Sequence, residues 1–115
     1  SDDLRSKCAR ALRFIIEKLT DLRALDRTLQ EPQLPPEVCK FVVHQISKVL
    51  PNDPQGRHDF VATGGLAACQ ALDARSGSAL KEHVDVIKSC YPEEIVRYYA
   101  PTYGTELLEK LEVTA

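Results

Sequence analysis

The sequence has no tryptophan and no methionine, and only 6% of its 115 residues are aromatic. No apolar run approaches the roughly 20 residues that a membrane-spanning helix needs, so we expect no membrane partner. Seven prolines and five glycines are too few for a collagen-like or disordered chain. The length and the 43% apolar content instead indicate one domain with a modest hydrophobic core.

Neither sign of charge dominates, because 15 basic residues stand against 17 acidic ones and the net charge is −2. Residues 1–50 hold nine basic and seven acidic side chains, whereas residues 51–115 hold six and ten. A nucleic-acid-binding domain usually has a strongly basic face. The balance therefore argues against a nucleic-acid partner, although it permits a local basic patch in the first half.

The four cysteines, Cys8, Cys39, Cys69 and Cys90, are far apart in the sequence, so none is paired at the close spacing of a zinc site. Each has aliphatic neighbours in a helical pattern. We predict four buried, reduced thiols that pack as small apolar side chains, with two disulfides as the alternative. Reduced thiols favour a reducing compartment, and we expect no metal and no cofactor.

Apolar residues recur at helical spacing along the chain, and no stretch alternates with a period of two. Proline and glycine separate the helical segments. Three long helices are predicted at residues 4–19, 35–50 and 78–90, with Ser78 as the N-cap of the third. Shorter helices are predicted at residues 21–29, 54–63, 66–74, 92–101 and 105–112.

The long helices repeat along the sequence. When the first is aligned on the second, Cys8 matches Cys39 and Ile15 matches Ile46, and when the second is aligned on the third, Ile46 matches Ile87. Two short helices followed by a long one, at a period of roughly 42 residues, are the armadillo pattern. The interval between the first and second long helices is about ten residues shorter than this period. We therefore predict that the first repeat lacks most of one short helix.

The predicted fold is therefore all-α, an armadillo-type α-solenoid fragment of about two to three repeats plus a C-terminal helical cap. An irregular helical bundle is the alternative. Residues 1–115 would form one domain, with a shortened repeat and long helix at 1–50, a full repeat at 51–91 and the cap at 92–115. All four tyrosines lie in residues 91–103, where we favour a structural cap over a docking epitope.

The chain starts without a methionine, so we expect it to be a piece of a longer protein. A solenoid repeat buries its apolar face on its neighbour. The first long helix should then be uncovered, and we predict self-association as a symmetric homodimer, through this helix or through the cap.

Three segments carry a resemblance to a known family, namely residues 51–54 (PNDP), 60–66 (FVATGGL) and 90–99 (CYPEEIVRYY). They are similar to the C-terminal end of the sperm-associated antigen six family, which comprises armadillo-repeat proteins of the central apparatus in motile cilia and flagella. The last segment is the most specific of the three. The similarity covers nearly the whole chain.

This resemblance implies a non-enzymatic scaffold that supports central-pair stability and flagellar motility. Its partners would be other central-apparatus proteins and the central-pair microtubule. Its location would be the cytoplasm and cytoskeleton, in the axoneme of the cilium or flagellum. The runner-up function is a general cytosolic armadillo adaptor that binds peptide motifs.

Peptide-binding armadillo proteins carry asparagines along their long helices, and the corresponding positions here hold Phe14, Gln45 and Val86. Capture of an extended peptide backbone is therefore disfavoured. The first two long helices instead combine cations with aromatic side chains, which suits a surface for an acidic partner. Solvated helix faces are the alternative. The predicted protein-binding residues are Lys7, Arg10, Phe14, Lys18, Lys40, Phe41, His44 and Lys48.

No pattern indicates a catalytic centre, and we predict that the protein is not an enzyme. The three histidines are isolated in the sequence, and His83 falls in an apolar arc that favours a core position. A cysteine–histidine nucleophile would require a pairing in space that a sequence cannot show. A small hydrolase would need a pocket converging on His44 or His83.

Overall fold

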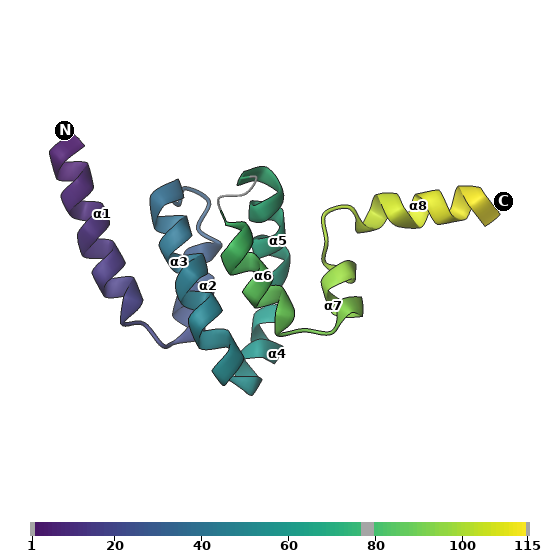
Figure 1. Ribbon diagram of the computed structural model, residues 1–115, viewed down its shortest axis with the longest axis horizontal. Helices are drawn as coiled ribbons and strands as arrows, with labels where there is room; N and C mark the ends of the chain where they lie inside the picture. Colours follow the sequence, from purple (N-terminus) through teal and green to yellow (C-terminus); the bar gives the residue numbers. More distant parts are fainter. Residues whose placement is uncertain (1, 77–79, 115) are drawn as a thin grey trace.

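The computed structural model describes residues 2–76 and 80–114, and these residues form helices and turns without any strand (Figure 1). The predicted N-cap at Ser78 lies outside the described residues. No helix among them is both long enough and apolar enough to cross a bilayer. The elements are α1 (Asp2–Glu17), α2 (Leu22–Leu29), α3 (Pro36–Val49), the 3-10 turn η1 (Leu50–Asn52), α4 (Pro54–Ala62), α5 (Gly65–Ser76), α6 (Lys81–Ser89), α7 (Glu93–Tyr98) and α8 (Tyr103–Thr114).

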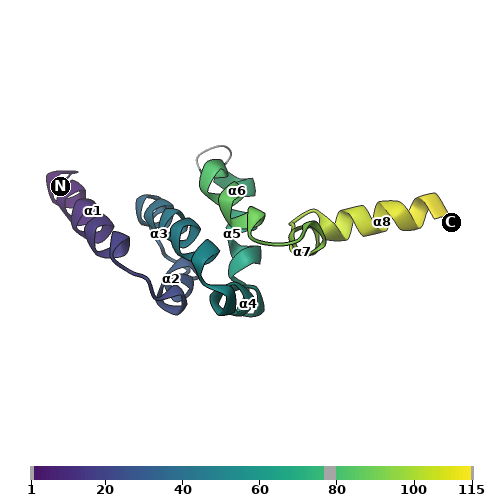
Figure 2. The same ribbon diagram turned by 60° about the horizontal axis from the view of Figure 1, so that its bottom comes forward.

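Helices α1, α3 and α6 lie side by side in chain order, and α3 contacts both of its neighbours (Figures 1 and 2). Helices α2 and α5 pack against α3 and α6 respectively, and α4 contacts both α2 and α5. The predicted lengths are wrong for the second repeat, because α5 has 12 residues and α6 has nine. The molecule is elongated, with extents of 59 × 33 × 22 Å. This sequential stacking confirms the all-α solenoid-type fold and excludes a closed bundle.

The first repeat is short by one helix. A complete triplet, α4 and α5 followed by α6, lies between α3 and the C-terminal region, whereas only α2 lies between α1 and α3. The short sequence interval between the first two long helices predicted this loss. The stack nevertheless continues without a break, because α2 contacts both α3 and the next repeat.

Capping residues decide where the short helices begin. Asp21 precedes α2, and its Oδ1 accepts a hydrogen bond from the amide of Arg23 at 3.1 Å. Asp53 does the same for the amide of Gly56 at 2.9 Å, with a proline at the start of α4. Gly64 has a φ of +90°, which allows the sharp turn between α4 and α5. The predicted separation of helical segments by proline and glycine is confirmed here at Pro54 and Gly64.

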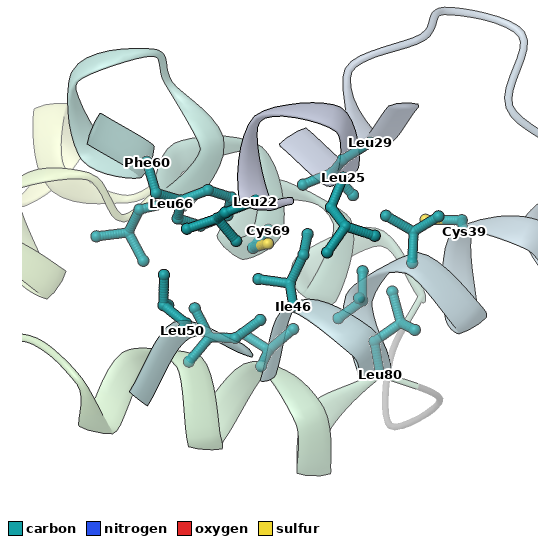
Figure 3. Close-up of a cluster of buried hydrophobic side chains, with 14 of the residues drawn as sticks. Leu22, Leu25, Leu29, Cys39, Ile46, Leu50, Phe60, Leu66, Cys69 and Leu80 are labelled. Atoms are coloured by element: carbon teal, nitrogen blue, oxygen red, sulfur yellow. The ribbon is translucent and has the colours of Figure 1, made fainter. Parts of the chain in front are cut away.

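The core lies between α3 and α6 on one side and α2, α4 and α5 on the other, and all five helices contribute to it (Figure 3). Leu25, Ile46, Leu50 and Leu66 are completely buried. Burying such a side chain stabilises a fold by roughly 1.5–3 kcal/mol. The helical spacing of apolar residues predicted for residues 35–50 is confirmed, since the buried apolar side chains there are Val38, Cys39, Val42, Val43, Ile46 and Leu50.

Three predicted burials are wrong. Cys8 is exposed on α1 and Cys90 is only partly buried, whereas Cys39 and Cys69 are buried, and none of the four cysteines forms a disulfide. His83 is also only partly buried, although it falls in the predicted apolar arc of its helix. The core takes Leu80 and every third or fourth residue after it, so α6 buries a narrower stripe than the sequence pattern suggests.

The C-terminal region is attached through α7. The side-chain amide of Gln70 on α5 donates to the carbonyl of Val96 at 3.1 Å, and the Tyr91 hydroxyl donates to the carbonyl of Arg57 at 2.8 Å. Tyr91 and Tyr99 pack against the core, as expected for a cap. Helix α8 extends away from the stack (Figure 1).

Candidate protein-interaction surface

We call the eight residues predicted to bind a partner the cationic surface. Four of them lie on or just after α1, and Phe14 is the most prominent because its side chain is 61% exposed. The ammonium group of Lys18 lies 4.0 Å from the centroid of the Phe14 ring. This cation–π contact holds an apolar ring beside a positive charge at the surface. Lys7 and Arg10 are exposed on the same helix.

The other four residues lie on α3. Lys40 and Lys48 are exposed, whereas Phe41 and His44 are partly buried. Phe41 is covered by Arg13 of α1, whose guanidinium carbon lies 5.7 Å from the ring centroid. A hollow of about 140 Å³ lies at this junction, lined by Arg13, Glu17, Lys40, Phe41, His44 and Gln45.

The two groups of predicted residues meet through side chains that the sequence analysis did not select. Arg13 reaches Phe41, and its Nε donates to Glu17 Oε1 at 2.8 Å. The side-chain amide of Gln45 donates to the carbonyl of Leu19 at 2.7 Å and so ties α3 to the end of α1. The spacing of four between Arg13 and Glu17 was a usable signal for an ion pair on one helix face.

At this surface, His44 acts as an uncharged aromatic ring. It stacks on His83 of α6, with ring centroids 4.2 Å apart and an interplanar angle of 22°. Burial lowers the pKa of His44, and the nearby His83 and Lys48 lower it further. The imidazole is therefore held in its neutral form near pH 7, and the positive charge of the surface rests on lysine and arginine.

Several of these cations are available to a partner. Lys7 is paired with Asp3 at 3.3 Å, but this pair is highly exposed and therefore weak. Arg10, Lys40 and Lys48 make no ion pair with any side chain that the structure describes. The hydrogen bond from Arg13 lowers the pKa of Glu17, whose carboxylate is already engaged.

The surroundings of the histidines do not resemble a hydrolytic site. The hollow beside His44 has no hydroxyl or thiol side chain in its lining, and His83 is not part of it. Burial raises the pKa of Cys69, which makes this thiol a poor nucleophile. Within residues 2–76 and 80–114, no three metal-ligating side chains gather into a possible metal site. The absence of enzymatic activity stays a prediction.

A larger hollow of about 850 Å³ lies between α2 and α4. None of the predicted binding residues lines it, and the sequence analysis did not anticipate it. No local signal in the sequence indicates it, because its walls come from two helices of different repeats that only the fold brings together.

The chain was also compared with known proteins. Sperm-associated antigen 6 of Homo sapiens and sperm-associated antigen 6 of Mus musculus are each 46% identical to it over 112 residues. The match covers 97% of this chain but 22% of each relative, so the chain spans about a fifth of their length. No protein-family model and no solved structure matches it. The predicted resemblance is confirmed, and nearly the whole chain is related in sequence to a segment of sperm-associated antigen 6.

Proposed function

We propose that the protein is a non-enzymatic interaction scaffold of the axonemal central apparatus. The observation that carries this proposal is the 46% identity to the two sperm-associated antigens over nearly the whole chain. An elongated helical stack with an exposed cation–aromatic face is suited to binding proteins side by side. The scaffold would support central-pair stability and flagellar motility, in the axoneme.

The cationic surface would hold an acidic partner within this assembly, either another central-apparatus protein or the central-pair microtubule. Arg10, Lys40 and Lys48 offer charges without an intramolecular partner among the described side chains. Such charges accelerate and orient association. Phe14 adds an exposed aromatic side chain, the residue class that most often anchors an interface.

Co-sedimentation with isolated axonemes tests this proposal. The wild-type chain should sediment with central-pair components, and the double variant Arg10→Glu/Lys18→Glu should lose most of this association, because it places two carboxylates beside an acidic partner. Raising the salt concentration should weaken the wild-type association for the same reason.

The matched control is Lys81→Glu/Arg97→Glu, which makes the same change in net charge on α6 and α7. It should sediment as the wild type does. If the surface variant sediments unchanged, the cationic surface is not the contact. If the wild type fails to sediment with axonemes yet binds extended peptides from a library, the cytosolic adaptor is the better description.

A further inference from the structure

The hollow at the junction of α1 and α3 has the size of a single side chain. Its volume is about 140 Å³, well below the roughly 300–1,000 Å³ that is usual for small-molecule sites. Its walls come from both helices, with Arg13 and Glu17 on α1 and Lys40, Phe41, His44 and Gln45 on α3. A cavity of this size accepts one side chain of a partner and excludes a whole ligand or a helix.

Positive charge predominates around this hollow. Arg13 and Lys40 line it, and Glu17 is the one carboxylate among its lining residues. Lys48 lies close enough to lower the pKa of both Glu17 and His44, so it adds a third positive charge nearby. Lys40 is exposed and forms no ion pair within the described part of the chain. An acidic side chain is therefore attracted to the hollow, and a basic one is repelled.

Arg13 keeps donors for a second carboxylate. Its Nε donates to Glu17 Oε1 at 2.8 Å, and no other side chain of residues 2–76 and 80–114 pairs with its guanidinium. Guanidinium groups bind carboxylates through two parallel hydrogen bonds, and the two terminal nitrogens of Arg13 are suited to this. The guanidinium carbon lies 5.7 Å from the centroid of the Phe41 ring, so an apolar wall lies beside the donors.

We propose that this hollow receives a glutamate side chain from an acidic segment of a partner protein. The carboxylate contacts Arg13 and Lys40, and its methylene stem lies against Phe41. This inference rests on the proposed function and deepens it, because it assigns to the acidic partner one side chain and one point of contact. It also adds Arg13, which the sequence analysis did not select, to the binding residues.

His44 lines the same hollow and makes the contact dependent on pH. The charged and titratable groups that act on it are Arg13 and Glu17 of α1, Lys48 of α3 and His83 of α6. Burial first, and then His83 and Lys48, lower its pKa, so the imidazole is neutral at pH 7.5. A carboxylate bound beside it favours the protonated form. Protonation must then favour the carboxylate in return, and binding should strengthen as the pH falls from 7.5 to 6.

Three peptides of equal length test the proposal by NMR titration of the purified, isotope-labelled chain. They alternate serine with glutamate, with aspartate or with glutamine. The glutamate peptide should bind at least about tenfold more tightly than the glutamine peptide, which lacks the charge. It should bind about threefold to fivefold more tightly than the aspartate peptide, whose stem is one methylene shorter. Equal binding of the glutamate and aspartate peptides would indicate diffuse charge attraction and overturn the proposal.

Matched variants locate the contact. Lys40→Gln should weaken binding of the glutamate peptide by about fivefold or more, whereas Lys81→Gln removes the same charge from α6 and should have no effect. Glu17→Gln should strengthen binding, because the incoming carboxylate no longer meets a like charge, and Glu82→Gln on α6 should not. A gain in affinity cannot result from misfolding. If either pair of variants behaves alike, the proposal is wrong.

The pH dependence tests the part played by His44. His44→Phe should abolish the strengthening between pH 7.5 and pH 6, and His58→Gln, which removes an exposed histidine on α4, should retain it. Circular dichroism verifies that each variant is folded at both pH values. A full pH effect in His44→Phe would contradict the assigned role of His44.

Failure of this proposal is distinguishable from failure of the proposed function. The axoneme experiment changes Arg10 and Lys18, neither of which lines this hollow. If Lys40→Gln binds the glutamate peptide as the wild type does while the wild type still sediments with axonemes, only the assigned hollow is wrong. If the peptide binds as expected and the wild type does not sediment, the hollow is an acidic-peptide site and the axonemal role is wrong.

Discussion

Arg13 shows how a single side chain connects two elements that are distant in the sequence. It lies over the ring of Phe41 and is held by Glu17, so it closes the junction between α1 and α3. Its neighbours on α1 were predicted to bind a partner because the helix combines cations with an aromatic side chain. Arg13 was not predicted, because the identity of the facing side chain depends on how two helices cross, which the periodicity of one helix does not contain.

At the residue scale, the pair His44–His83 predicts a dependence of stability on pH. The pKa of His44 is lowered from 6.5 in the folded protein, first by burial and then by His83 and Lys48, while Glu17 opposes the shift. The unfolded chain therefore binds the proton more readily. Stability should be fully present above pH 6.5 and should fall as the pH drops below this value.

Urea unfolding at pH 7.5 and pH 5 measures this effect. His44→Phe keeps an aromatic ring and removes the titrating group, so its stability should change less between the two pH values. His58→Gln removes an exposed histidine outside the pair and should retain the wild-type dependence. If the free energy of unfolding falls by the same amount between pH 7.5 and pH 5 in the wild type and in His44→Phe, the prediction is contradicted.

At the scale of the helices, the boundaries follow from local chemistry. The proline at the start of α4 and the glycine turn at Gly64 occur where the sequence predicts breaks between helices, because each depends on one residue and its immediate backbone. Which side of a helix is buried is less local. Val86 is 42% exposed, although Val84 and Ile87 on the same helix are completely buried.

Gly64→Ala should destabilise the protein by roughly 1–2 kcal/mol, because a φ of +90° is unfavourable for a residue with a side chain. Steric clash adds little, since the nearest side-chain atom to an added Cβ is Gln30 Oε1 at 3.8 Å. Gly104→Ala is the matched control, because an added Cβ there meets nothing within 4 Å and φ is not positive. Equal melting temperatures for the two variants would refute this account of the turn.

At the scale of the whole molecule, much of the apolar side of α1 is exposed, although Ile16 is buried. Leu4 is 62% exposed and Ile15 is 55% exposed. The residue on α3 that corresponds to Ile15 is Ile46, which is completely buried beneath the short helices. The same position in the repeat thus lies in the core on one helix and at the surface on the other. Exposed apolar side chains along one helix favour association.

We therefore expect the purified chain to form a symmetric dimer through α1 at high concentration. Ile15→Glu should shift it to the monomer, because the substitution places two like charges at the shared surface. Leu108→Glu is the control, because Leu108 is an exposed apolar residue on α8 (63% exposed), and it tests association through the C-terminal region. Light scattering distinguishes these cases, and a wild-type monomer at high concentration would contradict the prediction.

The helical class, the repeat and the loss of one short helix were all predictable from the sequence, because apolar period, proline, glycine and caps act over a few residues. The cation–aromatic character of the surface was predictable for the same reason. The stacking of His44 on His83, the bridge by Arg13 and the hollow beside α2 depended on how the helices pack. These features arise from contacts between residues that are distant in the chain, so only the tertiary structure decided them.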